Sequence, residues 1–241
     1  MTPFLEPLPW DTDFFGFPIG RADLAGATVE RLQEIEDEAR SSGIVCAYGT
    51  VDPTQGDAGY LAQTFGYRLV EIAITYARRA GALPPWSSAS TVRPGTVDDL
   101  PALEPAISTL APWSRFGADP RFGPEAARRM HRAWVERTAG DGSERKLLVS
   151  EDDSGLTGFS TEVHSGVPRI DLMGVIKQGS GASWALMADF MERVGEGVVE
   201  GGPCAVRNIA PLKFVEHCGF SVARVEYRFH RWFDEDAGGG R

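Results

Sequence analysis

The segment 175–187 joins an apolar, β-branched run to an amphipathic helix through a short loop of small residues. Glycines in this loop let the backbone come close to an anion, because glycine carries no Cβ. The helix that follows offers N–H groups without intrahelical partners and the positive end of its dipole. The segment therefore predicts a strand, a phosphate-binding loop and a helix over 181–195. The loop residues are Gln178, Gly179, Ser180, Gly181, Ala182 and Ser183.

The loop sequence, Gln-x-x-Gly-x-Ser, resembles the Arg/Gln-x-x-Gly-x-Gly/Ala pyrophosphate loop of the GCN5-related N-acetyltransferases (GNATs). Two further segments resemble that family in the same order along the chain. The stretch 91–100 is similar to the family's first strand and helix start. Asn208-x-x-Pro211 followed by Gly219-Phe220 is similar to its late helix and ending. The resemblance implies an α/β fold with a mixed central sheet flanked by helices.

The resemblance also implies an activity and a donor site. GNATs transfer an acyl group from a phosphopantetheine thioester, usually acetyl-CoA, to an amine. We therefore expect an N-acyltransferase whose donor contacts the loop, the backbone of Met173 and Val175, and Asn208. The oxyanion would be stabilised by backbone N–H groups where the strand 167–176 separates from the next strand.

Two departures from the family pattern concern the chemistry. Val175 and Gln178 are two residues closer together than in the family, so the loop is shorter. Val215 stands where the family places a tyrosine that protonates the leaving thiolate. A thiol has a pKa near 8.5, so its anion leaves without much help, and a missing general acid costs about 10²–10⁴-fold in rate.

One branch of the family resembles the chain over nearly its full length: the TDP-fucosamine acetyltransferases, which acetylate a nucleotide-linked amino sugar. The stretch 8–20 is similar to that branch's N-terminal signature, and 170–175 to its central strand. The stretch 114–122, with Trp134, is similar to its substrate-side region. The resemblance implies a small-molecule amine, such as an amino sugar, as the acceptor.

Composition limits the function classes. Lys and Arg number 24 and Asp and Glu 34, so the net charge of −10 repels polyanions and argues against nucleic-acid or membrane binding. The opening residues lack the pattern of a secretory signal, which predicts a cytoplasmic protein. The four histidines and three cysteines have no metal-ligand spacing, so we expect no metal site and reduced thiols. A homodimer is an open alternative to a monomer.

The stretch 81–90 combines tandem prolines with small polar residues and is interpreted as a linker. It separates a small α/β domain, 1–80, from a GNAT domain, 91–233, and a disordered tail is expected at 234–241. Periodicity predicts helices at 28–41, 58–65, 97–109, 124–139, 181–195 and 209–218. It predicts strands at 44–50, 68–79, 91–93, 146–151, 156–164, 167–176, 203–207 and 222–233.

The end of the first domain is similar to the end of the chain. Residues 61–78 and 214–231 align without a gap as a helix, a glycine-aromatic stop and an alternating strand. The smaller domain is therefore interpreted as a related, half-GNAT-like unit, with a coincidental helix–glycine–strand similarity as the alternative.

Base candidates flank the turn at Gly166. Glu162, His164 and Asp171 carry groups that could accept the amine's proton. Histidine is suited to this role because the ordinary pKa of an imidazole lies near neutral pH. The alternatives are a buried partner for Asp171 and an exposed hairpin position for His164. Tyr227 could replace the missing acid or contact substrate if it faces inward, and core packing is its other interpretation.

Acceptor-binding candidates are Trp113, Arg115, Phe116 and Arg121, where two arginines beside aromatic rings could bind phosphate or carboxylate. A surface pairing with Asp119 is the alternative. Because Lys177 is the one basic residue near the loop, a second hypothesis replaces free acyl-CoA by phosphopantetheine on an acyl carrier protein. A third keeps acyl-CoA binding without catalysis.

Overall fold

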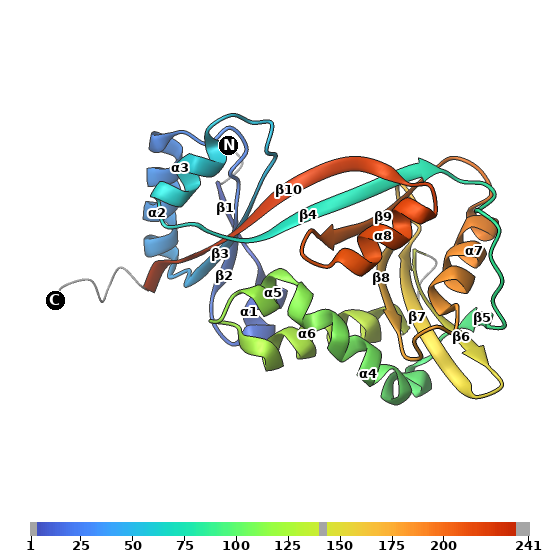
Figure 1. Ribbon diagram of the computed structural model, residues 1–241. Helices are drawn as coiled ribbons and strands as arrows, with labels where there is room; N and C mark the ends of the chain where they lie inside the picture. The colour runs from blue at the N-terminus through green and yellow to red at the C-terminus, as the bar shows by residue number, and fades with distance from the viewer. Residues whose placement is uncertain (1–3, 140–143, 235–241) are drawn as a thin grey trace. The chain divides into compact units, whose positions relative to one another are not determined.

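The structure is a computed structural model that describes residues 4–139 and 144–234 (Figure 1). The described chain divides into two compact units. The first contains the residues up to Ala73 and those from Val225 onward, and the second contains Ile74–Arg224. The expected tail at 234–241 lies almost entirely outside the described residues.

The first unit is a small α/β unit with the strand order β1-β2-β3-β10-β4. Its elements are β1 (Leu5–Pro7), α1 (Pro9–Phe15), β2 (Ile19–Ala22), α2 (Val29–Ser42), β3 (Cys46–Val51), α3 (Ala58–Thr64) and the start of β4 (Arg68–Arg79). Strands β2 and β3 are parallel, whereas β3 and β10 (Ser221–Trp232) are antiparallel. Helix α2 begins at the N-cap Thr28, whose side chain accepts from the N–H of Arg31, and ends at the left-handed Gly43.

The second unit has the strand order β10-β4-β9-β8-β7-β6-β5. Its further strands are β5 (Thr91–Pro94), β6 (Arg145–Asp152), β7 (Gly155–Val163), β8 (Arg169–Val175) and β9 (Val198–Ala205). Its helices are η1 (Val97–Asp99), α4 (Leu100–Leu110), η2 (Ala111–Trp113), α5 (Arg115–Ala118), α6 (Gly123–Ala139), α7 (Ala182–Val194) and α8 (Ile209–His217).

Helices cover both faces of β8 in the second unit. Leu172 packs in a cluster with residues of α4 and α6, and the adjacent Met173 packs with residues of α7 and α8. Successive side chains of a strand point to opposite faces, so these two clusters lie on opposite sides of the sheet. Most of the helices and strands predicted from periodicity are present. The strand predicted at 203–207 begins earlier, at Val198, because β9 continues through two glycines and a proline.

The division differs from the expected boundary at 81–90. The strand beside β3 is β10, and the strand beside β9 is β4, so neither β3 nor β9 pairs with the long strand that follows it in the chain. The last part of β10 is therefore counted with the first unit, and the last part of β4 with the second. A boundary drawn at one point of the sequence cannot describe such an exchange.

The aligned segments 61–78 and 214–231 have the same local structure. Each is a helix, a glycine with a φ of +77° at Gly66 or +80° at Gly219, and a twelve-residue strand. In the first unit the guanidinium of Arg231 lies against Gly66, and in the second the guanidinium of Arg78 lies against Gly219. These arginines are equivalent in the alignment, so the repeat includes a tertiary contact at each helix end.

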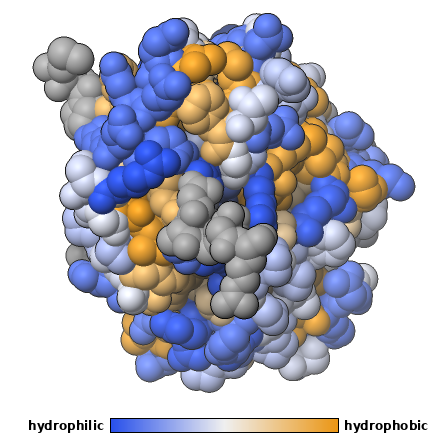
Figure 2. All heavy atoms as spheres, turned by 90° about the vertical axis from the view of Figure 1, so that its left-hand side faces the viewer, coloured by the Kyte–Doolittle hydropathy of each residue, from blue (hydrophilic) through white to orange (hydrophobic). Residues whose placement is uncertain are grey.

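Within the described ranges, no helix is both long and apolar enough to cross a membrane. On the face shown in Figure 2, hydrophilic residues divide the hydrophobic ones into several patches.

Candidate active site

Strands β8 and β9 separate at one point of the second unit. Their parallel register covers Arg169 with Glu200 and Ile170 with Gly201. On its other edge β8 remains paired with β7 as far as Val175. Within the described register, β8 beyond Ile170 thus keeps one partner strand and leaves the other edge open. This is the separation expected from the family resemblance.

The direction of the β8 N–H groups follows from the bond that ends the strand. The N–H of Ile176 donates to the carbonyl oxygen of Thr157, 2.9 Å away on the β7 side. The N–H of Leu172 also faces β7, where the Thr161 hydroxyl accepts it at 3.1 Å. Alternate residues of a strand face opposite edges, so the N–H groups of Met173 and Val175 face the open edge. These are two of the predicted donor contacts.

Asp171 is the extra residue of a β-bulge. Thr161 pairs with Leu172 and Glu162 pairs with Ile170, so Asp171 has no residue opposite it in β7. Its carboxylate accepts from the Nε of Arg169 at 2.7 Å and the Nη1 of Arg145 at 3.4 Å. Asp171 therefore has charged partners, as one alternative expected, but its ion pairs are partly exposed and not buried.

The predicted phosphate loop lies between the open edge and the start of α7. Gly179 and Gly181 have φ values of +77° and +79°, so both use the left-handed conformation that glycine allows. Gly181 is the N-cap of α7 and has no side chain to cap the helix, while the Ser180 hydroxyl accepts from the N–H of Ala182, the first residue of the helix, at 3.3 Å. A Cβ at Gly179 would meet no atom within 4 Å, so the loop is open there.

The segment 86–90, expected to be part of a linker, packs against this loop. The hydroxyls of Ser88 and Ser90 each lie 3.4 Å from the carbonyl oxygen of Ser180. The Trp86 ring lies 5.5 Å from that of Trp184. Loop and segment enclose a hollow of about 170 Å³. It is lined by Trp86, Val175, Lys177, Gln178, Gly179, Ser180, Gly181, Ala182, Ser183, Trp184, Phe214 and His217.

Lys177 is already paired. Its Nζ lies 2.9 Å from both a carboxylate oxygen of Asp152 and the hydroxyl of Ser154. Hydrogen bonds from Ser154 and then from Lys177 lower the pKa of Asp152 to about 2, so the pair stays charged over the physiological range. The basic side chain next to the loop is thus held toward the β6–β7 turn.

Glu162 and His164 form a separate group with α7. Glu162 is fully buried and accepts two hydrogen bonds from Arg193, at 2.6 and 2.9 Å. The Nε2 of His164 lies 3.0 Å from Oε2 of this carboxylate, the oxygen that also accepts from the Nη1 of Arg193. Arg193 is in the last turn of α7, whereas the loop precedes its first turn. The structure therefore separates these two base candidates from the loop by nearly the length of the helix.

Asn208 precedes the first residue of α8, and Val215 lies in its last turn. Asn208 is its N-cap residue and makes no side-chain capping bond. Val215 is buried with Phe220 in the cluster of α7 and α8. Its Cγ1 would lie 3.7 Å from a Cβ on Gly201, the last β9 residue paired with β8. At the position where the family has a tyrosine, this chain therefore has a valine that packs in the core.

Of the predicted acceptor residues, four lie together in the second unit. Trp113 ends η2 with 41% of its surface exposed, and Phe116 is buried in α5. The guanidinium of Arg115 lies 4.8 Å from the Phe116 ring centre, and the backbone N–H of Arg121 donates to Asp119. Tyr227 is in the first unit instead, opposite Val51 in β3 and packed against that unit's core, so core packing describes it.

The sequence carries one signal of the strand separation. Gly201, Gly202 and Pro203 lie inside β9, directly where β8 leaves it. Proline has no N–H to donate to a neighbouring strand, and glycine inside a strand often marks a bend. The strand predicted at 203–207 begins at Pro203 and leaves both glycines outside it.

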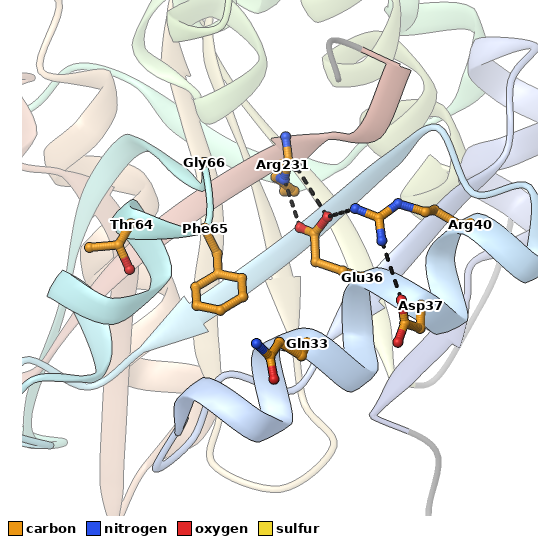
Figure 3. Close-up of a pocket in the computed structure, with 8 residues that line it drawn as sticks. All are labelled: Gln33, Glu36, Asp37, Arg40, Thr64, Phe65, Gly66 and Arg231. Atoms are coloured by element: carbon orange, nitrogen blue, oxygen red, sulfur yellow. Dashed lines mark hydrogen bonds and ion pairs between the residues drawn. The ribbon is translucent and has the colours of Figure 1, made fainter. Parts of the chain in front are cut away.

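A second hollow, of about 630 Å³, lies in the first unit (Figure 3). Its floor is a buried ion pair in which Arg231 donates from Nε and Nη2 to Glu36, at 2.9 and 3.2 Å. Arg40 donates to both Glu36 and Asp37 at its rim. Charges in this hollow neutralise one another, and β2 stays paired with β3 over all four of its residues. Strands β2 and β3 therefore do not separate within the length of β2.

Among the described residues, no three or more His, Cys, Asp or Glu side chains are grouped to hold a metal ion.

No protein-family model matches the sequence, and no curated protein matches it. Solved structures do. A conserved protein of unknown function from Staphylococcus epidermidis is 14% identical, with 90% of this chain and 84% of that chain covered and a TM-score of 0.64. A GCN5-related N-acetyltransferase from Kribbella flavida is 11% identical, with 89% and 81% covered and a TM-score of 0.59.

The chain has the fold of the GCN5-related N-acetyltransferases. A tandem GNAT protein from the clavulanic acid biosynthesis pathway is also similar, at 14% identity, 90% and 76% coverage and a TM-score of 0.55. The fold is therefore a GNAT fold with a smaller, related α/β unit before it, as expected from the internal repeat. The narrower amino-sugar branch remains a prediction.

Proposed function

We propose that the protein is an N-acyltransferase that moves an acyl group from a phosphopantetheine thioester to the amine of a small molecule. The observation that carries this proposal is the open edge of β8, which leads directly into the loop before α7. Such an edge offers hydrogen bonds to an extended amide chain, as an added β-strand would. Phosphopantetheine is a chain of this kind, with two amides along its length, a thiol at one end and a phosphate at the other.

In this proposal the donor's amides bond to the backbone of Met173 and Val175, and its phosphate contacts the N–H groups of the loop and of α7. The amine nitrogen attacks the thioester carbonyl carbon, the C–S bond breaks, and the sulfur leaves as a thiolate. Backbone N–H groups near the bulge stabilise the charge on the carbonyl oxygen. One proton of the amine passes to a base, and Val215 supplies none to the thiolate.

Asp171 is the base candidate that the arrangement favours. It lies at the bulge, where β8 turns from a doubly paired strand into one with an open edge. Glu162 is fully buried in its ion pair with Arg193, whereas the Asp171 side chain keeps 25% of its surface exposed and can be reached by an acceptor. His164 is oriented by the Glu162 carboxylate.

The donor is either free acyl-CoA, such as acetyl-CoA, or an acyl carrier protein bearing phosphopantetheine. The pairing of Lys177 with Asp152 supports the second candidate, because it commits the loop's basic side chain that could bind the extra 3′-phosphate of CoA. We propose an amino sugar linked to a nucleotide, or a comparable amine, as the acceptor, with Trp113, Arg115, Phe116 and Arg121 on its side of the site.

The proposal is tested by calorimetric titration of the purified protein with CoA, with phosphopantetheine and with carrier protein bearing it. Thiol release from acetyl-CoA and from acetylated carrier is then followed across a panel of amines. Binding with amine-dependent thiol release supports the proposal, and preference for one donor separates the two candidates. Binding without transfer to any amine would favour a non-catalytic acyl-CoA-binding protein. No binding of any of the three would refute the proposal.

A further inference from the structure

We propose that Arg207 is a positioning residue for the acceptor: its guanidinium holds the segment 111–114 beside the opening between β8 and β9. This inference rests on the proposed function. We expect acceptor binding to depend on this guanidinium and donor binding to be independent of it.

Arg207 joins two segments that are far apart in the sequence. Its Nη2 lies 2.6 Å from the carbonyl oxygen of Pro112 and 3.0 Å from that of Ser114. One nitrogen thus serves two carbonyls on either side of Trp113. Carbonyls at the end of a short helix such as η2 lack helical partners, and a cationic donor is a strong replacement.

The Arg207 guanidinium and its two bonds to Pro112 and Ser114, here called the tether, lie near the end of the opening where β8 and β9 have separated. Arg207 follows the end of β9 and precedes Asn208, the N-cap of α8. Parallel strands end at the same edge of a sheet, so the end of β9 and the loop after β8 lie on one side of the opening. Because β8 and β9 are paired at 169–170 and separate afterwards, this is the wider side.

The local structure of 111–114 shows why a tether matters there. The Ser114 hydroxyl accepts from the N–H of Gly117 and lies 2.9 Å from the carbonyl oxygen of Ala111, which closes a compact turn. Trp113 nevertheless keeps 41% of its surface exposed. With both flanking carbonyls held by Arg207, the backbone that carries this indole has a defined position, and an aromatic ring so placed can pack against the body of an acceptor.

Two exposed apolar residues are near Arg207 in the sequence. Val206 and Ile209 are 38% and 53% exposed. We infer that the acceptor presents an apolar or ring face here and its amine toward the bulge.

The test compares Arg207→Met, which keeps the aliphatic stem, with Arg207→Lys, which keeps the charge on a different, shorter head group. Arg132→Met is the control, since it removes a similarly exposed arginine of the same unit that makes one 3.2 Å ion pair with Glu104. We expect Arg207→Met to raise the acceptor KM about tenfold or more, because it removes two charged hydrogen bonds. Arg207→Lys should recover part of this loss. Donor Kd, measured by titration with phosphopantetheine, should stay within about twofold for all variants.

A readout that needs no activity accompanies these measurements. Amide hydrogen exchange of the peptides that cover 111–118 should be faster in Arg207→Met than in wild type or Arg132→Met. Unchanged exchange would overturn the tether, whatever the enzyme does. Faster exchange with an unchanged acceptor KM, or with donor Kd weakened as much as the KM, would overturn the positioning role. If the wild-type protein binds no donor, the proposed function is refuted. The exchange measurement would still show whether Arg207 holds the segment 111–114 in place.

Discussion

The N–H of Ile176 donates a 2.9 Å hydrogen bond to the carbonyl oxygen of Thr157. This bond determines the phase of β8, because N–H groups alternate in direction along a strand. It places the N–H groups of Met173 and Val175 on the edge that β9 leaves. A shift of one residue would turn these donors toward β7 and close the candidate donor site.

Gly179→Ala should weaken donor binding about tenfold without unfolding the protein. The left-handed φ of +77° costs alanine about 1 kcal/mol, and the added methyl lies where the phosphate is expected. Gly166→Ala is the matched control, since its φ is +70° and its surroundings are equally open. Equal donor Kd values for the two variants would remove the phosphate site. Gly181 is a poorer probe, because a Cβ there would lie 2.8 Å from the Ser88 hydroxyl.

Asp171→Asn should lower kcat about 10²-fold or more while the unfolding free energy changes little, since Asp171 is partly exposed. Glu162→Gln should show the opposite pattern and lose roughly 2–3 kcal/mol of unfolding free energy, because Arg193 would keep a partly buried, incompletely paired charge. Urea denaturation and pH–rate profiles of both variants measure this. A normal kcat in Asp171→Asn would return His164 to consideration.

Val215→Ala should keep most of the transfer rate, because valine donates no proton to the thiolate. The change should still lower the unfolding free energy by about 1–3 kcal/mol, since Val215 is buried in the cluster of α7 and α8. Single-turnover rates and denaturation curves separate the two effects. A rate loss much larger than the loss of folded protein would show that this position has a catalytic role.

Glu36→Gln should destabilise the protein by about 3–5 kcal/mol, because Arg231 would be left as a buried charge without its carboxylate. Glu6→Gln removes an exposed ion pair with Arg21 and should cost less than about 1 kcal/mol. Thermal unfolding of the two variants gives the comparison. Similar losses in both would mean that the floor of the first-unit hollow contributes little.

Acidification should reduce the stability that depends on His131. Burial lowers the pKa of this imidazole below its ordinary value of 6.5, against a smaller opposing effect of its bond to the Ala127 carbonyl. The folded state therefore favours the neutral ring, and this contribution is complete above about pH 6.5 and declines as the pH falls below it. The advantage of wild type over His131→Gln in urea unfolding should shrink between about pH 7 and pH 5. A constant difference over that range would contradict the prediction.

Much of the local structure was determined by the sequence. Thr96 and Asp99 form a capping box at the start of η1, in which the Asp99 carboxylate accepts from the Thr96 N–H at 2.9 Å. The glycines at 179 and 181 adopt the left-handed conformation before α7, and 61–78 and 214–231 share a helix, a glycine stop and a strand. These features depend on neighbours within a few residues, so the residue types themselves specify them.

Tertiary structure decided which strands are neighbours and which side chains meet. The exchange of β4 and β10, the opening after Ile170 and the pairing of Glu162 with Arg193 join residues distant in the chain. The same holds for the packing of 86–90 on the donor loop and for the bond from Arg207 to Pro112. Each depends on strand register and on long-range packing, which residue type and periodicity along the chain do not encode.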